Sequence, residues 1–193
     1  MSLLRAFIAI EIPTEIQQKV YKATSNFRRG IDSLVRWTAM DNMHLTLKFL
    51  GDVPQPNIEF LIQILRTQAG LVSPFAIQLA GLGSFPSPRR PRVIYIGIQA
   101  PAALGTLQRE IESAVRRLGY ESEERPFSPH LTLGRVRQNI SPVDQQTIRH
   151  AIEGTQVDVP GSARVDSVHL YKSELKPSGS VYTRLYSAPL KKS

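Results

Sequence analysis

The tetrapeptide His-Leu-Thr-Leu occurs twice in this chain, at residues 44–47 and, 86 positions later, at residues 130–133. The flanking sequence keeps the same spacing. RAFIAIEIP before the first copy is matched by RVIYIGIQAP before the second, and a proline follows each histidine after twelve residues. A match of four residues can arise by chance, but a series of matching segments in the same order indicates a duplication. The chain is therefore predicted to be an internal duplication, with repeats at about 5–82 and 92–175.

Each repeat shows the same predicted order of elements: strand, helix, HLTL strand, helix and strand. Apolar residues at helical spacing indicate the helices, and short alternating runs indicate the strands. The helical segments are residues 14–29 and 57–70 in the first repeat and 102–118 and 141–154 in the second. We predict an α+β fold in which duplicated β-α-β units form one bilobal, pseudo-twofold domain over 1–193. Two antiparallel-type sheets should line a central cleft, with the helices outside.

The HLTL strands should present polar and apolar residues on opposite faces, because successive side chains of a strand alternate. The polar set is His44, Thr46 and Lys48 in the first copy and His130 and Thr132 in the second. The leucines and Phe49 point the other way and are expected to anchor each strand on the core. If a twofold axis relates the two lobes, the polar faces meet across the cleft.

Two imidazoles and two hydroxyls around one cleft suit proton transfer. Imidazole has an ordinary pKa of about 6.5, so it can donate or accept a proton near neutral pH. A pair can divide these roles, one ring acting as general base and the other as general acid. Threonine hydroxyls can donate hydrogen bonds to phosphoryl oxygens. A single strand histidine is more often structural than catalytic, but two at equivalent positions, each followed by threonine at the same spacing, favour a shared site.

Several segments of the chain resemble the 2H phosphoesterase superfamily: the two H-x-T motifs and the blocks RAFIAIEIP, HLTLKFLGDV, FPSPRRPRVIYIGI, FSPHLTLGRV and LYKSELKPSGSVYTRLYSAPL. Within it, the chain is similar to the RNA 2′,3′-cyclic phosphodiesterases, historically called 2′-5′ RNA ligases. The resemblance implies an enzyme that opens an RNA-terminal 2′,3′-cyclic phosphate to a 2′-phosphate without a metal or other cofactor. The implied roles are His44 as proton donor, His130 as proton acceptor, and Thr46, Thr132 and Arg135 as phosphate-binding residues.

Arg135 departs from simple alternation, because a regular strand would aim it away from the face that carries His130. Gly134 offers a bulge or a strand end that could redirect it. Without that distortion, Lys48 is the better-placed cation. The candidate RNA contacts are Lys48, Arg89, Arg90, Arg92 and Tyr182. The candidates for stacking on a terminal base are Phe7, Trp37 and Tyr182.

Composition limits the remaining function classes. The net charge of +8 fits either a polyanion partner or a well-solvated basic surface, and charge alone does not separate them. The absence of Cys excludes disulfides, thiolate metal sites and a cysteine nucleophile. We expect no metal, no membrane segment, a cytoplasmic location and a monomer. Of the other two histidines, His150 is predicted to be a surface residue and His169 a structural one.

Two alternatives remain open at this stage. The same pair of histidines could act on another cyclic phosphate, such as ADP-ribose 1″,2″-cyclic phosphate, or on a 2′-5′ linkage. A catalytically idle module that binds RNA ends would use the same cleft. The expected partners are RNA with a 2′,3′-cyclic phosphate terminus and small nucleoside cyclic phosphates.

Overall fold

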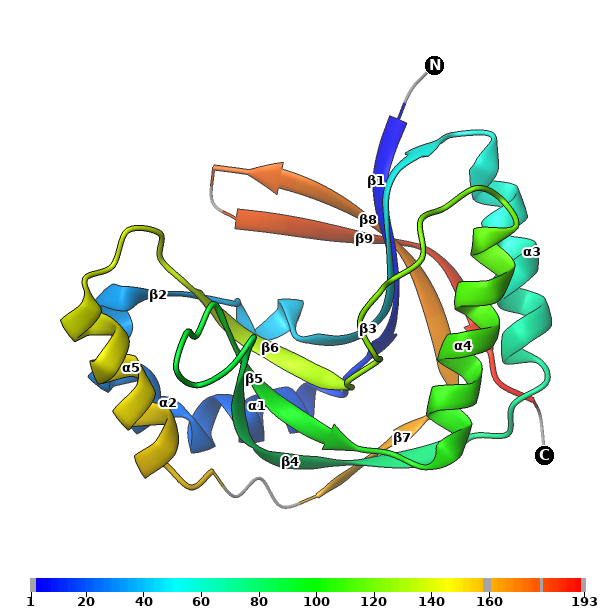
Figure 1. Cartoon of the computed structure of the whole chain (residues 1–193). Coiled ribbons are helices and arrows are strands. Elements are labelled where there is room, and N and C mark those ends of the chain that lie inside the picture. The colour runs from blue at the N-terminus through cyan, green and yellow to red at the C-terminus, as the bar shows by residue number, and fades with distance from the viewer. Residues whose placement is uncertain (1–2, 158–160, 178, 192–193) are drawn as a thin grey trace.

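A computed structural model describes residues 3–157, 161–177 and 179–191 and shows the expected α+β architecture (Figure 1). The strands are β1 (Leu3–Glu11), β2 (Val35–Trp37), β3 (His44–Pro54), β4 (Phe75–Phe85), β5 (Val93–Gln99), β6 (His130–Val136), β7 (Ser162–Val165), β8 (Ser167–Lys176) and β9 (Gly179–Pro189). The helices are α1 (Thr14–Ala23), α2 (Ser25–Gly30), α3 (Asn57–Ala69), α4 (Ala102–Arg116) and α5 (Pro142–Gly154). Short 3-10 turns lie at Asp32–Leu34 and Met40–Asn42.

Two predicted elements are divided in the structure. The helix expected over residues 14–29 is broken at Thr24, whose hydroxyl donates to the Val20 carbonyl at 2.8 Å. Such a bond back to the preceding turn competes with the helical pattern and bends the chain. The last predicted strand of the second repeat, in the strand-like sequence of residues 163–175, is interrupted at Asp166. As a result, β7 pairs with β4, whereas β8 pairs with β1 and β9.

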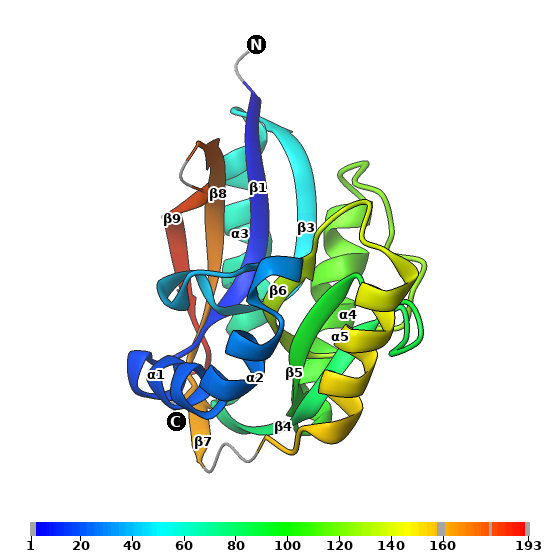
Figure 2. The same ribbon diagram turned by 90° about the vertical axis from the view of Figure 1, so that its left-hand side faces the viewer.

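The strands form one curled antiparallel sheet with the order β7-β4-β5-β6-β3-β1-β8-β9, and β2 pairs with β6 (Figure 2). The two sheets expected from the sequence are the two halves of this sheet. The halves meet where β3 lies against β6, through the pair of Leu45 and Leu131. Both leucines are 0 % exposed. The bilobal α+β fold is therefore confirmed, with the two lobes sharing one sheet.

The duplication is visible in the strand register, because the residue pairs of the two halves correspond one to one. In the first half, Phe7 faces Phe49, Ala9 faces Thr46 and Glu11 faces His44. In the second half, Val93 faces Arg135, Tyr95 faces Thr132 and Gly97 faces His130. Every member of the second set lies 86 positions after its counterpart. Each half also has a β-bulge at the same place, at Leu47 and at Leu133.

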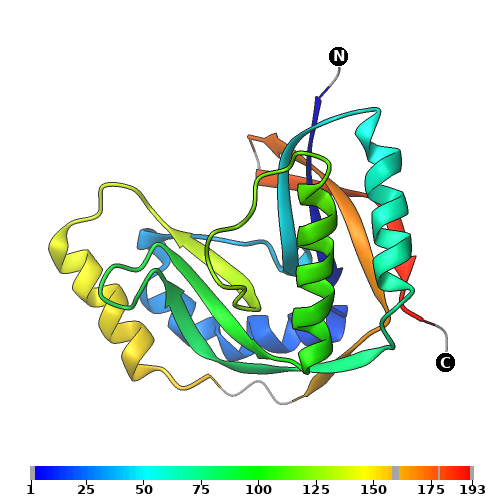
Figure 3. The ribbon, with the colours of Figure 1, turned by 45° about the vertical axis from the view of Figure 1, so that its right-hand side comes forward.

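The two sequence repeats exchange elements in space. Strand β4 belongs to the first repeat but pairs with β5, and β8 belongs to the second repeat but pairs with β1. Helices α3 and α4 pack on each other and on β3, although they come from different repeats (Figure 3). On the other half, α2 packs on α5, and α5 packs on β4. Each half-sheet is thus built and covered by segments of both repeats.

Gly134 lies where β2 packs against β6, opposite Trp37. A Cβ added there would come within 2.7 Å of Val35 Cγ1 and within 2.9 Å of both the Arg36 carbonyl oxygen and Trp37 Cε3. The carbonyl cannot yield without moving β2. We therefore expect Gly134→Ala to lower the free energy of unfolding by about 1–3 kcal/mol, measured by urea denaturation.

The matched control for this prediction is Gly81→Ala in β4, because nothing lies within 4 Å of the Cβ that it would add. The control should unfold at nearly the wild-type urea concentration. Equal losses of stability in the two variants would contradict the described packing of β2 on Gly134.

Candidate active site

The pair of Leu45 and Leu131 sets the geometry of the site. Because both leucines are buried, their neighbours along each strand point to the opposite face of the sheet. Continuing the antiparallel register by one residue in each direction sets the histidine of each motif against the threonine of the other. The four neighbours on this face are His44, Thr46, His130 and Thr132. A local twofold axis between the leucines relates the two motifs.

His44 is held in one orientation by its backbone neighbour and two aromatic rings. Its Nδ1 lies 2.8 Å from the Asn42 carbonyl oxygen. The imidazole stacks on Phe7, with 4.7 Å between ring centroids, and meets Tyr182 edge-on at 5.3 Å. These contacts leave the ring little freedom to turn.

His130 is held in the same way by different residues. Its Nδ1 lies 2.7 Å from the Ser128 carbonyl oxygen. Its ring meets Phe85 edge-on at 4.9 Å between centroids and lies tilted against Tyr95 at 5.2 Å. Neither Phe85 nor Tyr95 was predicted from the sequence to belong to the site. Tyr95 faces Thr132 across the ladder between β5 and β6, a pairing that the local sequence pattern does not reveal.

The two hydrogen bonds select the same tautomer in both rings. In each case, the carbonyl two residues before the histidine can only accept, so Nδ1 carries a hydrogen and donates it. Nε2 is then the atom left to accept or release a proton. The site therefore has two proton-exchanging nitrogens, one from each half of the duplication.

The surroundings lower the pKa of both rings. Burial lowers the pKa of His44; the hydrogen bond to Asn42 opposes this effect, and positive charge on His130 reinforces it. Burial also lowers the pKa of His130; the hydrogen bond to Ser128 opposes it, and the Arg135 guanidinium reinforces it. Since an unperturbed imidazole has a pKa of about 6.5, both rings are largely neutral at pH 7 in the ligand-free site.

A β-bulge brings Arg135 to the face that carries His130. Leu133 is the extra residue of the bulge in the ladder with β5. Leu133 and Gly134 are both buried, so the alternation is reset and Arg135 becomes exposed. The bulge that the sequence suggests at this glycine is confirmed. It places the guanidinium close enough to lower the pKa of the His130 ring.

The equivalent bulge at Leu47 overturns two predictions made from simple alternation in the first half. The prediction that Phe49 belongs to the core is wrong, because its side chain is 62 % exposed. The prediction that Lys48 shares the face of His44 is also wrong. Lys48 is only 6 % exposed, and its Nζ lies 2.8 Å from Glu112 Oε1 on α4. The structure therefore places Lys48 in the interior and Phe49 on the cleft face.

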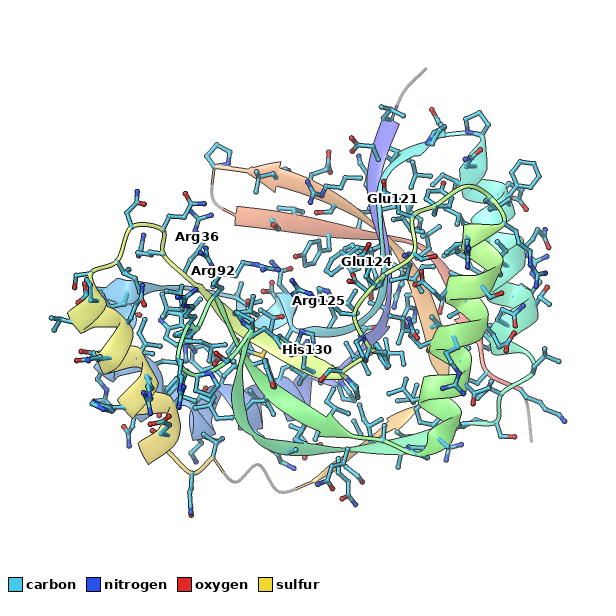
Figure 4. The ribbon with its side chains drawn as sticks, viewed as in Figure 1. Arg36, Arg92, Glu121, Glu124, Arg125 and His130 are labelled. Carbon is cyan, nitrogen blue, oxygen red and sulfur yellow. The ribbon has the colours of Figure 1, made fainter. Side chains whose placement is uncertain are left out.

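A cavity of about 440 Å³ opens beside Thr46 and His130. Its aromatic walls are Phe49, Phe85 and Phe127, and its charged lining residues include Glu112, Glu123 and Arg125. Figure 4 shows Arg125 near His130, at the start of β6. A pocket of this size with apolar walls and a few polar groups is typical of small-molecule sites. We call it the aromatic cavity.

The predicted basic contacts lie at the other end of β6. Arg90 and Arg92 line a second groove, of about 650 Å³, together with Arg135 and Arg137. Arg89 is exposed in the same loop between β4 and β5. Arg137 was not among the RNA contacts predicted from the sequence.

Two of the candidate stacking residues, Phe7 and Tyr182, contact the ring of His44, whereas the third does not face the site. Trp37 donates from Nε1 to Asp32 at 2.8 Å, and its ring meets Phe27 edge-on at 6.0 Å between centroids. Trp37 therefore packs between β2 and α2.

The remaining histidines have the predicted surroundings. His169 is 3 % exposed, with its Nε2 3.3 Å from Ser167 Oγ and 3.8 Å from Glu11 Oε2. His150 is exposed on α5. Within the described ranges, no group of three or more His, Cys, Asp or Glu residues is arranged to hold a metal ion. In the same part of the chain, no helix has the length and apolar character needed to span a membrane.

Comparison with known proteins identifies the family. Residues 12–177 match the model of the 2′-5′ RNA ligase superfamily. The chain is 33 % identical over 180 residues to an RNA 2′,3′-cyclic phosphodiesterase of Methanothermobacter thermautotrophicus, across 93 % of this chain and 95 % of that protein. A protein of the same name from Methanocaldococcus jannaschii is 33 % identical over 181 residues, across 93 % and 96 %. The crystal structure of E. coli LigT complexed with 3′-AMP matches with a TM-score of 0.81 and 26 % identity, across 99 % of this chain and 100 % of that one. The chain belongs to the 2′-5′ RNA ligase superfamily.

NMR titration of the imidazole rings tests the electrostatics of the site. In the wild-type protein, His44 and His130 should both titrate below pH 6.5. Replacing His130 with alanine should raise the pKa of His44, because loss of a neighbouring positive charge favours the protonated ring. Arg135→Gln should raise the pKa of His130 for the same reason.

The control for the titration is Arg117→Gln, which removes one positive charge at an exposed position just after α4. This variant should leave both curves unchanged. An unaltered His130 curve in Arg135→Gln would mean that the guanidinium does not face the ring.

Proposed function

We propose that this member of the 2′-5′ RNA ligase superfamily hydrolyses RNA-terminal 2′,3′-cyclic phosphates to 2′-phosphates without a metal ion. The observation that carries the proposal is the pairing of two identical H-x-T motifs around one local twofold axis, with both Nε2 atoms free for proton exchange. Relatives that the chain matches over most of its length are named RNA 2′,3′-cyclic phosphodiesterases. The geometry of the site accounts for that chemistry as follows.

The proposed step moves one proton from water to the departing oxygen. His130 Nε2 accepts a proton from water as the water oxygen bonds to phosphorus. The P–O3′ bond breaks with its electron pair on O3′, and His44 Nε2 donates a proton to that oxygen. The products are a 2′-phosphomonoester and a free 3′ hydroxyl. In-line displacement needs the base and the acid on opposite sides of phosphorus, and motifs related by a twofold axis meet this need.

The neighbours of the two rings differ, and this difference supports the assignment of roles. The Arg135 guanidinium disfavours protonation of His130, which suits a general base. The equivalent position in the first motif, five residues after His44, is Phe49, which adds no positive charge. When an anionic phosphate enters the site, its charge raises the pKa of a neighbouring imidazole. His44 is therefore the ring that takes up the proton needed by the leaving oxygen.

The remaining groups stabilise the charge that builds on phosphorus. Thr46 and Thr132 lie beside the histidines and can donate hydroxyl hydrogen bonds to the nonbridging oxygens. Arg135 adds a charge-assisted donor, which is stronger than a neutral one. Donors held on paired strands need little rearrangement as the transition state forms.

We also propose that residues 1–193 act as one catalytic domain, as a monomer in the cytoplasm. The exchange of elements between the repeats supports a single unit, since neither half-sheet is complete without both repeats. One chain supplies both motifs of the site. The absence of Cys is compatible with a reducing compartment.

We expect His44→Ala and His130→Ala each to lower kcat at least ~100-fold, the usual scale for a lost general acid or base. Binding of a 2′-phosphate-terminated product should largely survive in both variants. Steady-state kinetics and fluorescence anisotropy measure the two effects. The matched control is His150→Ala, which removes an exposed imidazole on α5 and should leave turnover at the wild-type level. Full turnover in either of the first two variants would remove the two-histidine mechanism.

Activity on a nucleoside 2′,3′-cyclic phosphate should persist in EDTA, because the proposed acid, base and cation are all side chains of the protein. Thin-layer chromatography should identify the nucleoside 2′-phosphate as the product. Loss of activity that a divalent ion restores would contradict metal independence. Exclusive formation of the 3′-phosphate would contradict the proposed cleavage at O3′. Binding of RNA ends without hydrolysis of any cyclic phosphate would indicate a catalytically idle binding module.

A further inference from the structure

The groove at the far end of β6 carries concentrated positive charge and is called the arginine groove here. Its charged lining residues are Arg90, Arg92, Arg135 and Arg137, joined by the side-chain amides of Gln138, Asn139 and Gln145. Among the described residues, no acidic side chain lines it. The ion pairs of the described residues involve other cations, none of which lines the groove. Within the described part of the chain, no ion pair therefore neutralises these four guanidinium groups.

Arg36 adds a fifth guanidinium beside this groove. It lies directly opposite Arg135 across the ladder between β2 and β6, so the two side chains share a face. Both are exposed, and Figure 4 shows Arg36 and Arg92 together beside β6. Like charges directly opposite on paired strands repel and destabilise the sheet. An anion bound between them would relieve this repulsion.

The arginine groove adjoins the candidate active site. Val93 lines both the aromatic cavity beside His130 and the arginine groove. Arg135 stands at the near end, and Arg92 lies alongside the end of β6, where its carbonyl accepts from the Val136 amide at 3.0 Å. At about 3.3 Å per residue, the six steps from His130 to Val136 span roughly 20 Å. This length accommodates several nucleotides of an extended strand.

The opposite side of the site has mixed charge, in contrast to the arginine groove, which no acidic side chain of the described residues lines. The loop before β6 carries Glu121, Glu123 and Glu124, all exposed. Figure 4 shows Glu121 and Glu124 on the far side of His130 from Arg36 and Arg92. The cations that line the aromatic cavity are Lys48, which is paired with Glu112, and Arg109 and Arg125, and Glu112 and Glu123 line it as well. The charge across the site therefore favours one direction for a phosphodiester chain.

We propose that the nucleotides on the 5′ side of the cyclic phosphate run from His130 into the arginine groove, while the terminal nucleoside occupies the aromatic cavity. The upstream phosphates are bound by Arg36, Arg90, Arg92 and Arg137. This inference rests on the proposed function. The additional phosphate contacts make an RNA strand of several nucleotides a better substrate than a nucleoside cyclic phosphate. The gain lies in KM rather than in kcat, because these remote contacts are equal in the bound substrate and the transition state.

Arg137→Gln is the variant of choice, because Arg137 lies beyond the reacting phosphate and is exposed. Kinetics are compared on cytidine 2′,3′-cyclic phosphate and on an RNA of about six nucleotides with the same cyclic end. The wild-type KM should be lower for the RNA. Arg137→Gln should raise the KM for the RNA about three- to tenfold and leave both constants for the mononucleotide unchanged. The slope of log(1/KM) against log salt for the RNA should become shallower by about 0.7.

Arg117→Gln is the matched control, because it removes the same charge outside both cavities and should change neither KM. Equal wild-type KM values for the two substrates would contradict RNA binding in the arginine groove but leave the proposed function standing. The same holds if Arg137→Gln raises the KM equally for both substrates. If neither substrate is hydrolysed, the proposed function fails instead.

Anisotropy then tests the groove independently of turnover, using a fluorescent 2′-phosphate-terminated RNA of the same length. Weaker binding by Arg137→Gln than by Arg117→Gln supports the groove. Identical binding by the two variants overturns it.

Discussion

One buried contact between two leucines fixes the relation between the halves of this molecule. Leu45 and Leu131 pair where β3 meets β6, and each is flanked by the histidine and threonine of its motif. A slip of one residue at this junction would turn one motif toward the opposite face of the sheet, because strand side chains alternate with a period of two. The burial of both leucines opposes such a slip. The catalytic proposal therefore depends on an apolar contact that takes no part in the chemistry.

Much of this arrangement could be predicted from the sequence, because repeated landmarks and apolar spacing are local features of a chain. They were sufficient for the duplication, the α+β class and the shared face of each H-x-T pair. The assignments at Lys48 and Phe49 failed because the bulge at Leu47 has no signature of its own. In the second half, Gly134 supplied that signature. The pairing of β4 and β8 with strands of the other repeat could not be predicted either, because the local sequence pattern does not determine which strands pair.

The duplicated frame is symmetric, but the chemistry proposed for it is not. Both imidazoles have the same tautomer and the same kind of backbone partner. They differ at the position five residues after each histidine, where the reset strand presents Arg135 in the second motif and Phe49 in the first. The same backbone distortion thus supplies a cation on one side of the site and an aromatic wall on the other.

The exchange of strands and helices between the repeats helps to explain how the two motifs can differ at equivalent positions. A homodimer of either repeat around the same axis would carry identical residues at both matching positions, two arginines or two phenylalanines. Covalent fusion frees each copy to vary alone, and the interlocking of the copies keeps the unequal partners together in every molecule. A substrate with two different ends, such as an RNA strand, can then be bound in one direction only. A perfectly symmetric assembly could not enforce that direction.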